Sequence, residues 1–382
     1  MPCYKKKACA CNFNIKTYGL CDATKIKFNG SDRTVLNWSE ISVPEMLTVP
    51  IQKPDIENID QVYVSTELTS AKLIKTPFAY NQYDILATPA QITSVTEILA
   101  TLTAVTAPVT AVTTAVTALL LTLDTVIDQS FITPLTTLNT QILAASTTLT
   151  TSIASLTAAL ALPNVTLSVI CAAITVVSET LALLQSLLTQ LIVQLTNILT
   201  NAGLDPVVDA TIITAINLLL NTTIGVATAA ITNAITAILG IISICDNTIV
   251  IVIKPNAEGT CLSGRKIIVG GTLIQKIVYT ANVTTQSVHS AHFNVPFSAF
   301  IIPYAKFENS EYTENVPVLI NGVPTTVNGF PFNSTEEFIP NLCEEFSVDV
   351  CIEDIFAYTI DVRTIFKNIT LFLKATPVKV CP

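Results

Sequence analysis

Residues 88–246 carry the most regular hydrophobic pattern of this chain. Two stretches, 95–126 and 170–198, have apolar residues at alternating steps of three and four, with weaker versions over 135–156 and 212–242. Such a pattern averages 3.5 residues per turn, the period of a coiled-coil seam, so we predict long amphipathic helices packed as a bundle. The seam positions are Val95, Ile98, Leu102, Val105, Val109, Val112, Val116, Leu119, Leu123 and Val126 in the first stretch, and Ile170, Ile174, Val177, Leu181, Leu184, Leu188, Leu191, Leu195 and Ile198 in the second.

Helix breakers fall between these stretches. Pro134, Pro163 and the segment 201–206 separate them, and Asp205, which a proline follows, suits the N-cap of the last helix. Pro108 lies inside the first stretch, where it should kink or split the helix. The predicted helices span about residues 90–130, 134–162, 165–201 and 206–244.

The regions on either side of the helices have the pattern of β-strands. Residues 247–254 are rich in β-branched side chains, and residues 347–362 alternate between polar and apolar side chains. Two further predicted strands, 267–269 and 273–279, are separated by Gly270-Gly271. Short strands with Gly, Pro and Asn turns are typical of a sandwich or a barrel.

These patterns predict an α+β fold in which one β domain, sandwich-like or barrel-like, is interrupted by a long helical insertion. The expected parts are a cysteine-rich tail at 1–33, a split β domain formed by 34–86 plus 247–382, and the helical insertion at 88–246.

Composition narrows the possible functions. Of the 382 residues 50% are hydrophobic and only 12% are charged, which excludes intrinsic disorder. The net charge of −9 argues against nucleic-acid binding, because neutralising phosphates requires clustered Lys and Arg. Residues 88–246 contain seven acidic residues and no Lys or Arg, and their outer helix faces are expected to be largely Thr and Ala without charge. Such a surface is suited to packing against copies of the same chain.

Membrane insertion is the alternative interpretation of this uncharged region. Fifty uncharged residues between Asp128 and Glu179 are apolar enough for a hydropathy window to detect. Against insertion, Thr, Ser, Asn and Gln recur on the opposite helix faces, and no basic residue or Trp/Tyr belt marks a membrane interface. We therefore expect a bundle buried in protein, with a membrane-active, pore-forming protein as the alternative.

Ten cysteines are unusual for a chain that begins without an apolar signal segment, and we expect them to crosslink assembled copies. The tail at 1–33 holds four of them and a lysine cluster; its spacing lacks the paired C-x2-C of a zinc site, so a flexible tail is favoured. Cys171 lies on a predicted helix and is expected to be a buried small hydrophobe. The disulfide or crosslink candidates are Cys3, Cys9, Cys11, Cys21, Cys261, Cys343, Cys351 and Cys381.

Candidate chemistry is sparse elsewhere. His289 and His292 are three residues apart, so in a strand they point to opposite faces and do not suit one metal ion. The acidic residues near the C-terminus, Glu344, Glu345, Asp349, Glu353 and Asp354, are explained by a solvated strand face. Gly270-Gly271 follows a strand without a phosphate-binding motif. We expect no catalytic, cofactor or metal site, and hence no enzyme.

Several long motifs outside the helices resemble the SPOCS domain of clostridial and bacillar spore proteins. Before the helices they are WSEISVPE at 38–45, VPIQKPDIENI at 49–59 and LIKTP at 73–77. After the helices they are GRKIIVGG at 264–271, QKIVY at 275–279, QSVHSAHFNVPFSAF at 286–300, VCIEDIF at 350–356 and RTIFKNITLF at 363–372.

This resemblance implies a scaffold or adaptor in spore envelope assembly rather than an enzyme. The chain departs from the family by its long helical insertion and by the lack of a LysM tail, which favours a building block, and it resembles the cysteine-rich exosporium lattice proteins of clostridia. The expected protein is synthesised in the mother cell without a signal peptide and resides in the exosporium or outer coat. Its expected partner is itself, as a ring in a two-dimensional lattice, together with other spore surface proteins. A non-catalytic morphogenetic adaptor is the further alternative.

Overall fold

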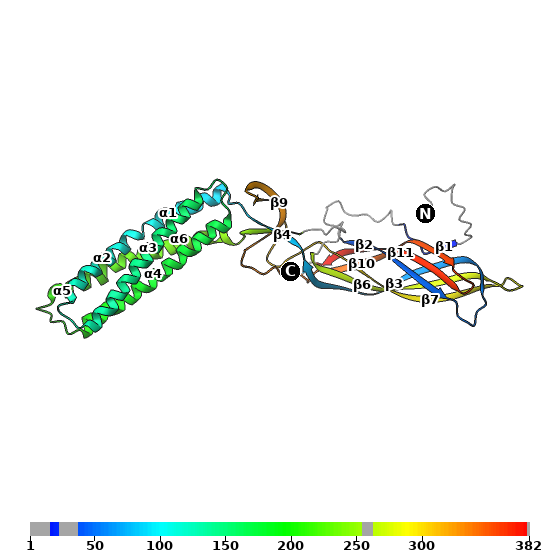
Figure 1. Cartoon of the computed structure of the whole chain (residues 1–382), viewed down its shortest axis with the longest axis horizontal. Coiled ribbons are helices and arrows are strands. Elements are labelled where there is room, and N and C mark those ends of the chain that lie inside the picture. Colours follow the sequence, from blue (N-terminus) through cyan, green and yellow to red (C-terminus); the bar gives the residue numbers. More distant parts are fainter. Residues whose placement is uncertain (1–15, 23–36, 254–262, 380–382) are drawn as a thin grey trace. The chain divides into compact units, whose positions relative to one another are not determined.

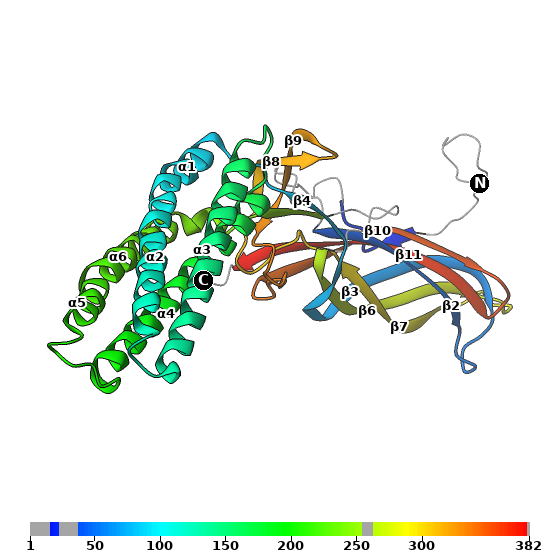
Figure 2. The same cartoon turned by 60° about the vertical axis from the view of Figure 1, so that its left-hand side comes forward.

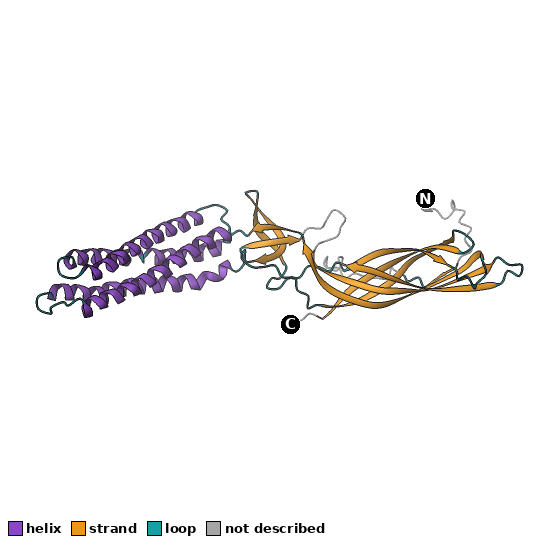
Figure 3. Ribbon diagram, turned by 60° about the horizontal axis from the view of Figure 1, so that its bottom comes forward, coloured by secondary structure: helices purple, strands orange, loops and turns teal. Residues whose placement is uncertain are grey.

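The computed structural model describes residues 16–22, 37–253 and 263–379, and the chain divides into two compact units (Figure 1). One unit takes its residues from 1–81, 253–310 and 338–382 and is built of strands. The other takes its residues from 82–252 and 311–337 and contains the helices. Both helices and strands are abundant, so the predicted α+β class is confirmed (Figure 3).

The strand unit is a β-sandwich of two sheets. One sheet has the order β1-β3-β6-β7 and the other β10-β11-β2, and within the described residues they do not close into a barrel. All neighbours are antiparallel except β1 and β3. The strands are β1 (Lys16–Tyr18), β2 (Trp38–Thr48), β3 (Ile56–Phe78), β6 (Ser263–Ala281), β7 (Val288–Ile301), β10 (Glu345–Thr359) and β11 (Thr364–Lys379).

Alternation along β6 and β11 explains why the two sheets pack together. Side chains two residues apart point to the same face of a strand, and in these strands that face is apolar and buried. The interior includes Ile267, Val269, Leu273, Ile277 and Tyr279 from β6, and Ile365, Ile369, Leu371 and Leu373 from β11.

The prediction that Gly270-Gly271 separates two strands is wrong, because β6 runs through it without a turn. A Cβ at Gly271 would lie 2.5 Å from the Phe297 ring and 2.8 Å from the Glu67 backbone oxygen. The glycine therefore makes room for the neighbouring strands rather than for a turn, a contact that local sequence does not reveal.

The helical unit includes a small sheet of its own, ordered β4-β5-β9-β8. A small core of Ile85, Leu167, Val250, Val316 and Val318 lies against it. The boundaries of the units therefore differ from those of the predicted domains. Residues 311–337, which include β8 and β9, belong to the helical unit although they are predicted in the β domain. The strands are β4 (Tyr80–Asp84), β5 (Ile249–Ile253), β8 (Thr313–Ile320) and β9 (Val323–Phe332).

The helices pack side by side as a bundle around the predicted seam (Figure 2). All seam residues of the two regular stretches are buried except Val126, which is 43% exposed. The elements are α1 (Pro89–Thr103), α2 (Thr106–Leu123), α3 (Gln129–Leu160), α4 (Leu167–Asn201), α5 (Ala210–Leu218), a π turn (Leu219–Thr223), α6 (Ile224–Ile241) and a 3-10 turn (Ile242–Cys245).

The helix boundaries agree with the prediction at Pro108 and differ from it at Pro134 and at Asp205. Pro108 splits the first predicted helix as expected, because α2 restarts at Thr106 and the proline occupies its first turn, where no backbone N–H is needed. Pro134 does not begin a helix: it lies inside α3, which starts earlier because Asp128 accepts a hydrogen bond from the Ser130 N–H. Asp205 likewise closes a turn, and the last helix begins only at Ala210.

The π turn keeps the last helix in register with the core. The buried residues Leu219 and Ile224 are five positions apart, a step that an α-helix does not place on one face. A single widened turn corrects this, so that Ile216 before it and Ala227 after it both remain buried.

The two ends of the helical region lie close together, as an insertion requires. The Ile85 N–H donates to the Thr248 carbonyl at 3.0 Å, and Leu86 forms a bridge with Thr166. The prediction that residues near 86 and 247 are neighbours is therefore confirmed.

Replacing residues 88–246 by a short Gly/Ser loop is expected to leave a folded β-sandwich, because Ile85 and Thr248 already meet and the sandwich has its own core. Circular dichroism and amide NMR dispersion of the shortened chain measure this. An unfolded product would show that the sandwich depends on the helices.

Candidate functional site

The predicted crosslink cysteines fall into two groups. Cys21 and Cys351 form a disulfide within the chain, and Cys343 is exposed in the segment before β10. Crosslinks between chains stay a prediction. The candidates that lie outside the described residues are Cys3, Cys9, Cys11, Cys261 and Cys381.

Cys21 follows a short strand that docks on the sandwich. β1 pairs in parallel with residues 61–63 of β3, and the Tyr18 ring stacks on Tyr63 with centroids 4.4 Å apart. The Cα atoms of Cys21 and Cys351 are 5.6 Å apart, and the Cys21 N–H donates to the Ile352 carbonyl at 3.0 Å. This part of the predicted flexible tail is therefore ordered on the β domain.

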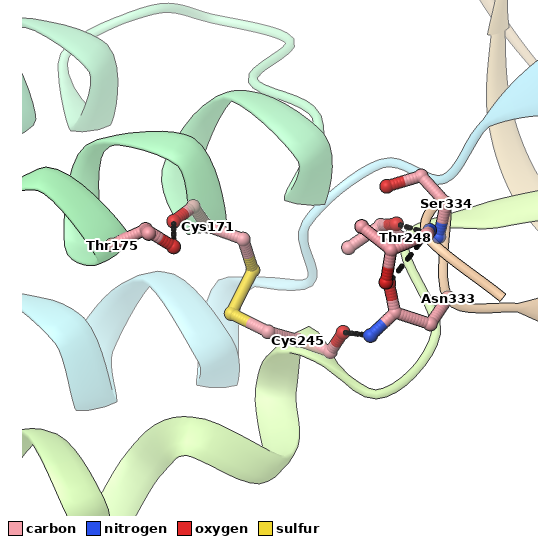
Figure 4. Close-up of a disulfide and its surroundings, with 7 residues drawn as sticks. Cys171, Thr175, Cys245, Thr248, Asn333 and Ser334 are labelled. Carbon is pink, nitrogen blue, oxygen red and sulfur yellow. Dashed lines mark hydrogen bonds between the residues drawn. A yellow bond between two sulfur atoms is a disulfide. The ribbon is translucent and has the colours of Figure 1, made fainter.

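Cys171 is buried as expected, at 8% exposed, but it is not an unbonded small hydrophobe, because it forms a disulfide with Cys245 (Figure 4). The bond joins the second turn of α4 to the 3-10 turn after α6. The Asn333 side chain donates to the Cys245 carbonyl at 3.2 Å, and the Ser334 N–H donates to the Thr248 hydroxyl at 3.1 Å. The pair thus ties the helices together where the chain leaves the bundle for the small sheet.

The outer surface of the bundle is polar in composition but has little unsatisfied hydrogen-bonding capacity. Every threonine of α3 donates its hydroxyl to the backbone carbonyl four residues earlier, for example Thr133 to Gln129 at 3.0 Å. A threonine in this state directs its hydroxyl inward along the helix and can present its methyl group outward. The others are Thr136, Thr137, Thr140, Thr147, Thr148, Thr150, Thr151 and Thr157.

Exposed apolar side chains also lie on the outer surface of the bundle. On α4, Val169, Val176 and Leu183 repeat every seven residues and are 44–51% exposed. Beside Leu183, two adjoining hollows of about 580 and 470 Å³ form a groove between α3 and α4 that shares Gln141 and Gln190 and has no charged side chain in its lining. Removing water from such a surface costs little free energy, because few of its polar groups lose a hydrogen bond.

Four segments of this unit are long and apolar enough to cross a membrane. They are 89–123, 129–160, 167–201 and 210–245, with mean hydropathy from 1.3 to 2.1. Only 17% of the most apolar window of the last segment is buried, so many of its apolar side chains remain partly exposed.

Two cations are buried in the sandwich, which the sequence analysis did not identify. Arg265 is 3% exposed; it donates to the Tyr304 and Asn341 carbonyls and pairs with Glu344 at 2.7 Å. Lys367 is 1% exposed and lies 3.6 Å from Glu45. Burial lowers the pKa of both cations, and the carboxylate partner partly opposes the shift. Both residues occupy positions of the strand alternation whose side chains point into the sandwich. This alternation is the sequence feature that indicates their burial.

The solvated-face interpretation of Glu344 is wrong, because its side chain is only 10% exposed and pairs with Arg265. Glu353 is partly buried, and burial raises the pKa of its carboxyl, with Glu40 adding to the effect.

The two histidines do not meet at a common point. The His289 ring lies 3.0 Å from the Ser287 hydroxyl and stacks on Tyr279, while His292 is exposed and opposite Lys276 on β6. Among the residues that the structure describes, no three His, Cys, Asp or Glu side chains are grouped to hold a metal ion.

Comparison with known proteins identifies one family. The family model described as SipL, SPOCS domain, matches residues 241–316, which run from the last helical turn through β5, β6 and β7 into β8. No curated protein and no solved structure matches the chain. Residues 241–316 are therefore similar to the SPOCS-domain family, which is not a known enzyme family, and this similarity indicates a spore-associated role.

Proposed function

We propose that this protein is a structural component of the bacterial spore surface, in the exosporium or outer coat, whose copies assemble into an ordered layer. The SPOCS match supports the association with spores. The observation that carries the proposal is the outer surface of the helices, which has few charged side chains and no basic one. On this surface threonine hydroxyls bond to their own helices and apolar side chains lie exposed.

This surface favours contact with a second protein surface over contact with water. A charged coat would have to be desolvated on assembly, whereas methyl groups and internally bonded hydroxyls release water at little cost. A second copy offers the same surface, on which residues 88–246 place only seven acidic side chains and no basic one. Disulfides from Cys3, Cys9, Cys11 and Cys381 would then lock assembled copies together.

Electron microscopy of the purified full chain tests the proposal, with arrays or filaments as the expected result. Val176→Lys with Leu183→Lys adds two cations to the exposed side of α4 and should disperse the assemblies. Val207→Lys with Val208→Lys changes residues that are 85% and 79% exposed in the turn before α5, and should assemble normally. Single particles from the unmodified chain would contradict self-assembly and favour the morphogenetic adaptor.

The four membrane-length segments favour one other candidate, a membrane-active protein whose helices enter a bilayer. Flotation of the full chain with liposomes in a density gradient separates the two. We expect the protein to stay unbound, because its seam residues are already buried in the bundle. Flotation with dye leakage would support the membrane-active protein instead.

A further inference from the structure

Residues 16–22 form a small element that docks at one edge of the sandwich. β1 is three residues long and all three are exposed. Its contacts include the parallel pairing with residues 61–63, the stacking of Tyr18 on Tyr63 and the hydrogen bond from the Cys21 N–H. The disulfide to Cys351 attaches the segment covalently.

The docking site nevertheless selects this segment by shape. Gly19 has φ +89°, a conformation that glycine adopts without strain. A Cβ at Gly19 would collide with the carbonyl oxygen of Val64 on β3. Only a strand with glycine at this position can place Tyr18 over Tyr63 and bring the next cysteine, Cys21, to Cys351.

We propose that this strand is exchanged between copies of the chain, so that residues 16–22 of one copy dock on β3 of another and Cys21 bonds to Cys351 of that copy. The idea rests on the proposed self-assembly and names the pair of cysteines that would join neighbours. Every contact of the docked segment is the same in the closed and the exchanged form, which is the condition for domain swapping.

The length of the connection allows this exchange. Residues 23–36 lie between the docked segment and the rest of the sandwich, and a chain of this length spans up to roughly 45 Å when extended. Neighbours in an array hold their docking sites at an effective concentration in the millimolar range, so a neighbour's site can compete with the chain's own site. Exchange in one direction would link copies into chains, and reciprocal exchange would make dimers.

The covalent step is an ordinary thiol oxidation. The Cys21 thiol of one copy and the Cys351 thiol of another lose two protons and two electrons to form one disulfide. Oxidised glutathione accepts them and becomes two molecules of reduced glutathione.

Mixing two single variants of the full chain tests the exchange. Cys351→Ser, labelled with ¹⁵N, can only donate its strand, and unlabelled Cys21→Ser can only accept it, so neither can close its own disulfide. After oxidation with glutathione, trypsin and cleavage after Glu isolate the two cysteines in residues 17–25 and 346–353. We expect mass spectrometry to find a labelled 17–25 peptide bonded to an unlabelled 346–353 peptide.

Glycine variants of the donor distinguish docking from random collision. Gly19→Ala in the donor should lower the yield of this peptide pair by about tenfold or more, because the strand no longer fits against Val64. Gly240→Ala, at a helical position with nothing within 4 Å, should leave the yield unchanged. An equal yield from the Gly19→Ala donor, or the absence of the mixed pair, would overturn the proposal.

A second measurement uses the unmodified chain, in case either serine variant does not fold. Labelled and unlabelled chains are reduced, mixed at increasing concentration and reoxidised. Mixed-isotope Cys21–Cys351 peptides that increase with concentration support exchange, whereas pairs of a single isotope at all concentrations overturn it. Arrays without mixed pairs would reject only the exchange, and mixed pairs without arrays would reject only the proposed function.

Discussion

Replacing Leu184 by alanine is expected to lower the free energy of unfolding of the helical unit by about 2–5 kcal/mol. Leu184 belongs to the seam of α4 and is fully buried, at 0% exposed. Truncation removes methyl groups that pack against other helices and leaves a cavity that the bundle fills only in part. Urea denaturation of the full chain, followed by the helical circular dichroism signal, measures the loss.

Leu183→Ala is the matched control for this substitution. Leu183 is the preceding residue of the same helix, and its side chain is 51% exposed. Its truncation should cost less than about 1 kcal/mol, so any assembly defect of a Leu183 variant reflects the surface rather than unfolding. Equal losses at the two positions would contradict the assignment of the seam.

Replacing Arg265 by methionine is expected to destabilise the sandwich by about 3–5 kcal/mol. The substitution leaves the nearly buried carboxylate of Glu344 without its cation and removes the donors that satisfy the Tyr304 and Asn341 carbonyls. Denaturation followed by a β-sheet signal, in the full chain, measures this change.

Lys266→Met tests the neighbouring cation in the same strand. Lys266 is only partly buried and lies 4.2 Å from the centroid of the Phe300 ring, so its loss should cost about 0.5–1 kcal/mol. Glu344→Leu combined with Arg265→Met should recover part of the stability, because it removes the orphaned charge. If Arg265→Met is no worse than Lys266→Met, the ion pair with Glu344 does not support the fold.

The predictions from the sequence that are wrong at particular residues have one common cause. Gly270-Gly271 has the composition of a turn, yet it lies inside β6, where Phe297 and Glu67 of the neighbouring strands leave no room for a Cβ at Gly271. Pro134 has the chemistry of a helix start, yet the Asp128 cap allows α3 to begin five residues before it. Arg265 and Lys367 have the charge of surface residues, yet carboxylate partners from other segments allow them to be buried. In each case a residue outside the local motif overrides the preference of that motif.

The hydrophobic period by itself determined the helical bundle and its core, because a 3–4 repeat places the same residues inward whatever the surroundings. Strand alternation and the family motifs likewise determined the β domain and its interruption by the helices. Only the tertiary structure decided that Cys171 bonds to Cys245, that Cys21 bonds to Cys351, and that β8 and β9 join the helical unit. Disulfide partners and sheet neighbours depend on which distant segments come within a few ångströms, and no local pattern encodes that distance.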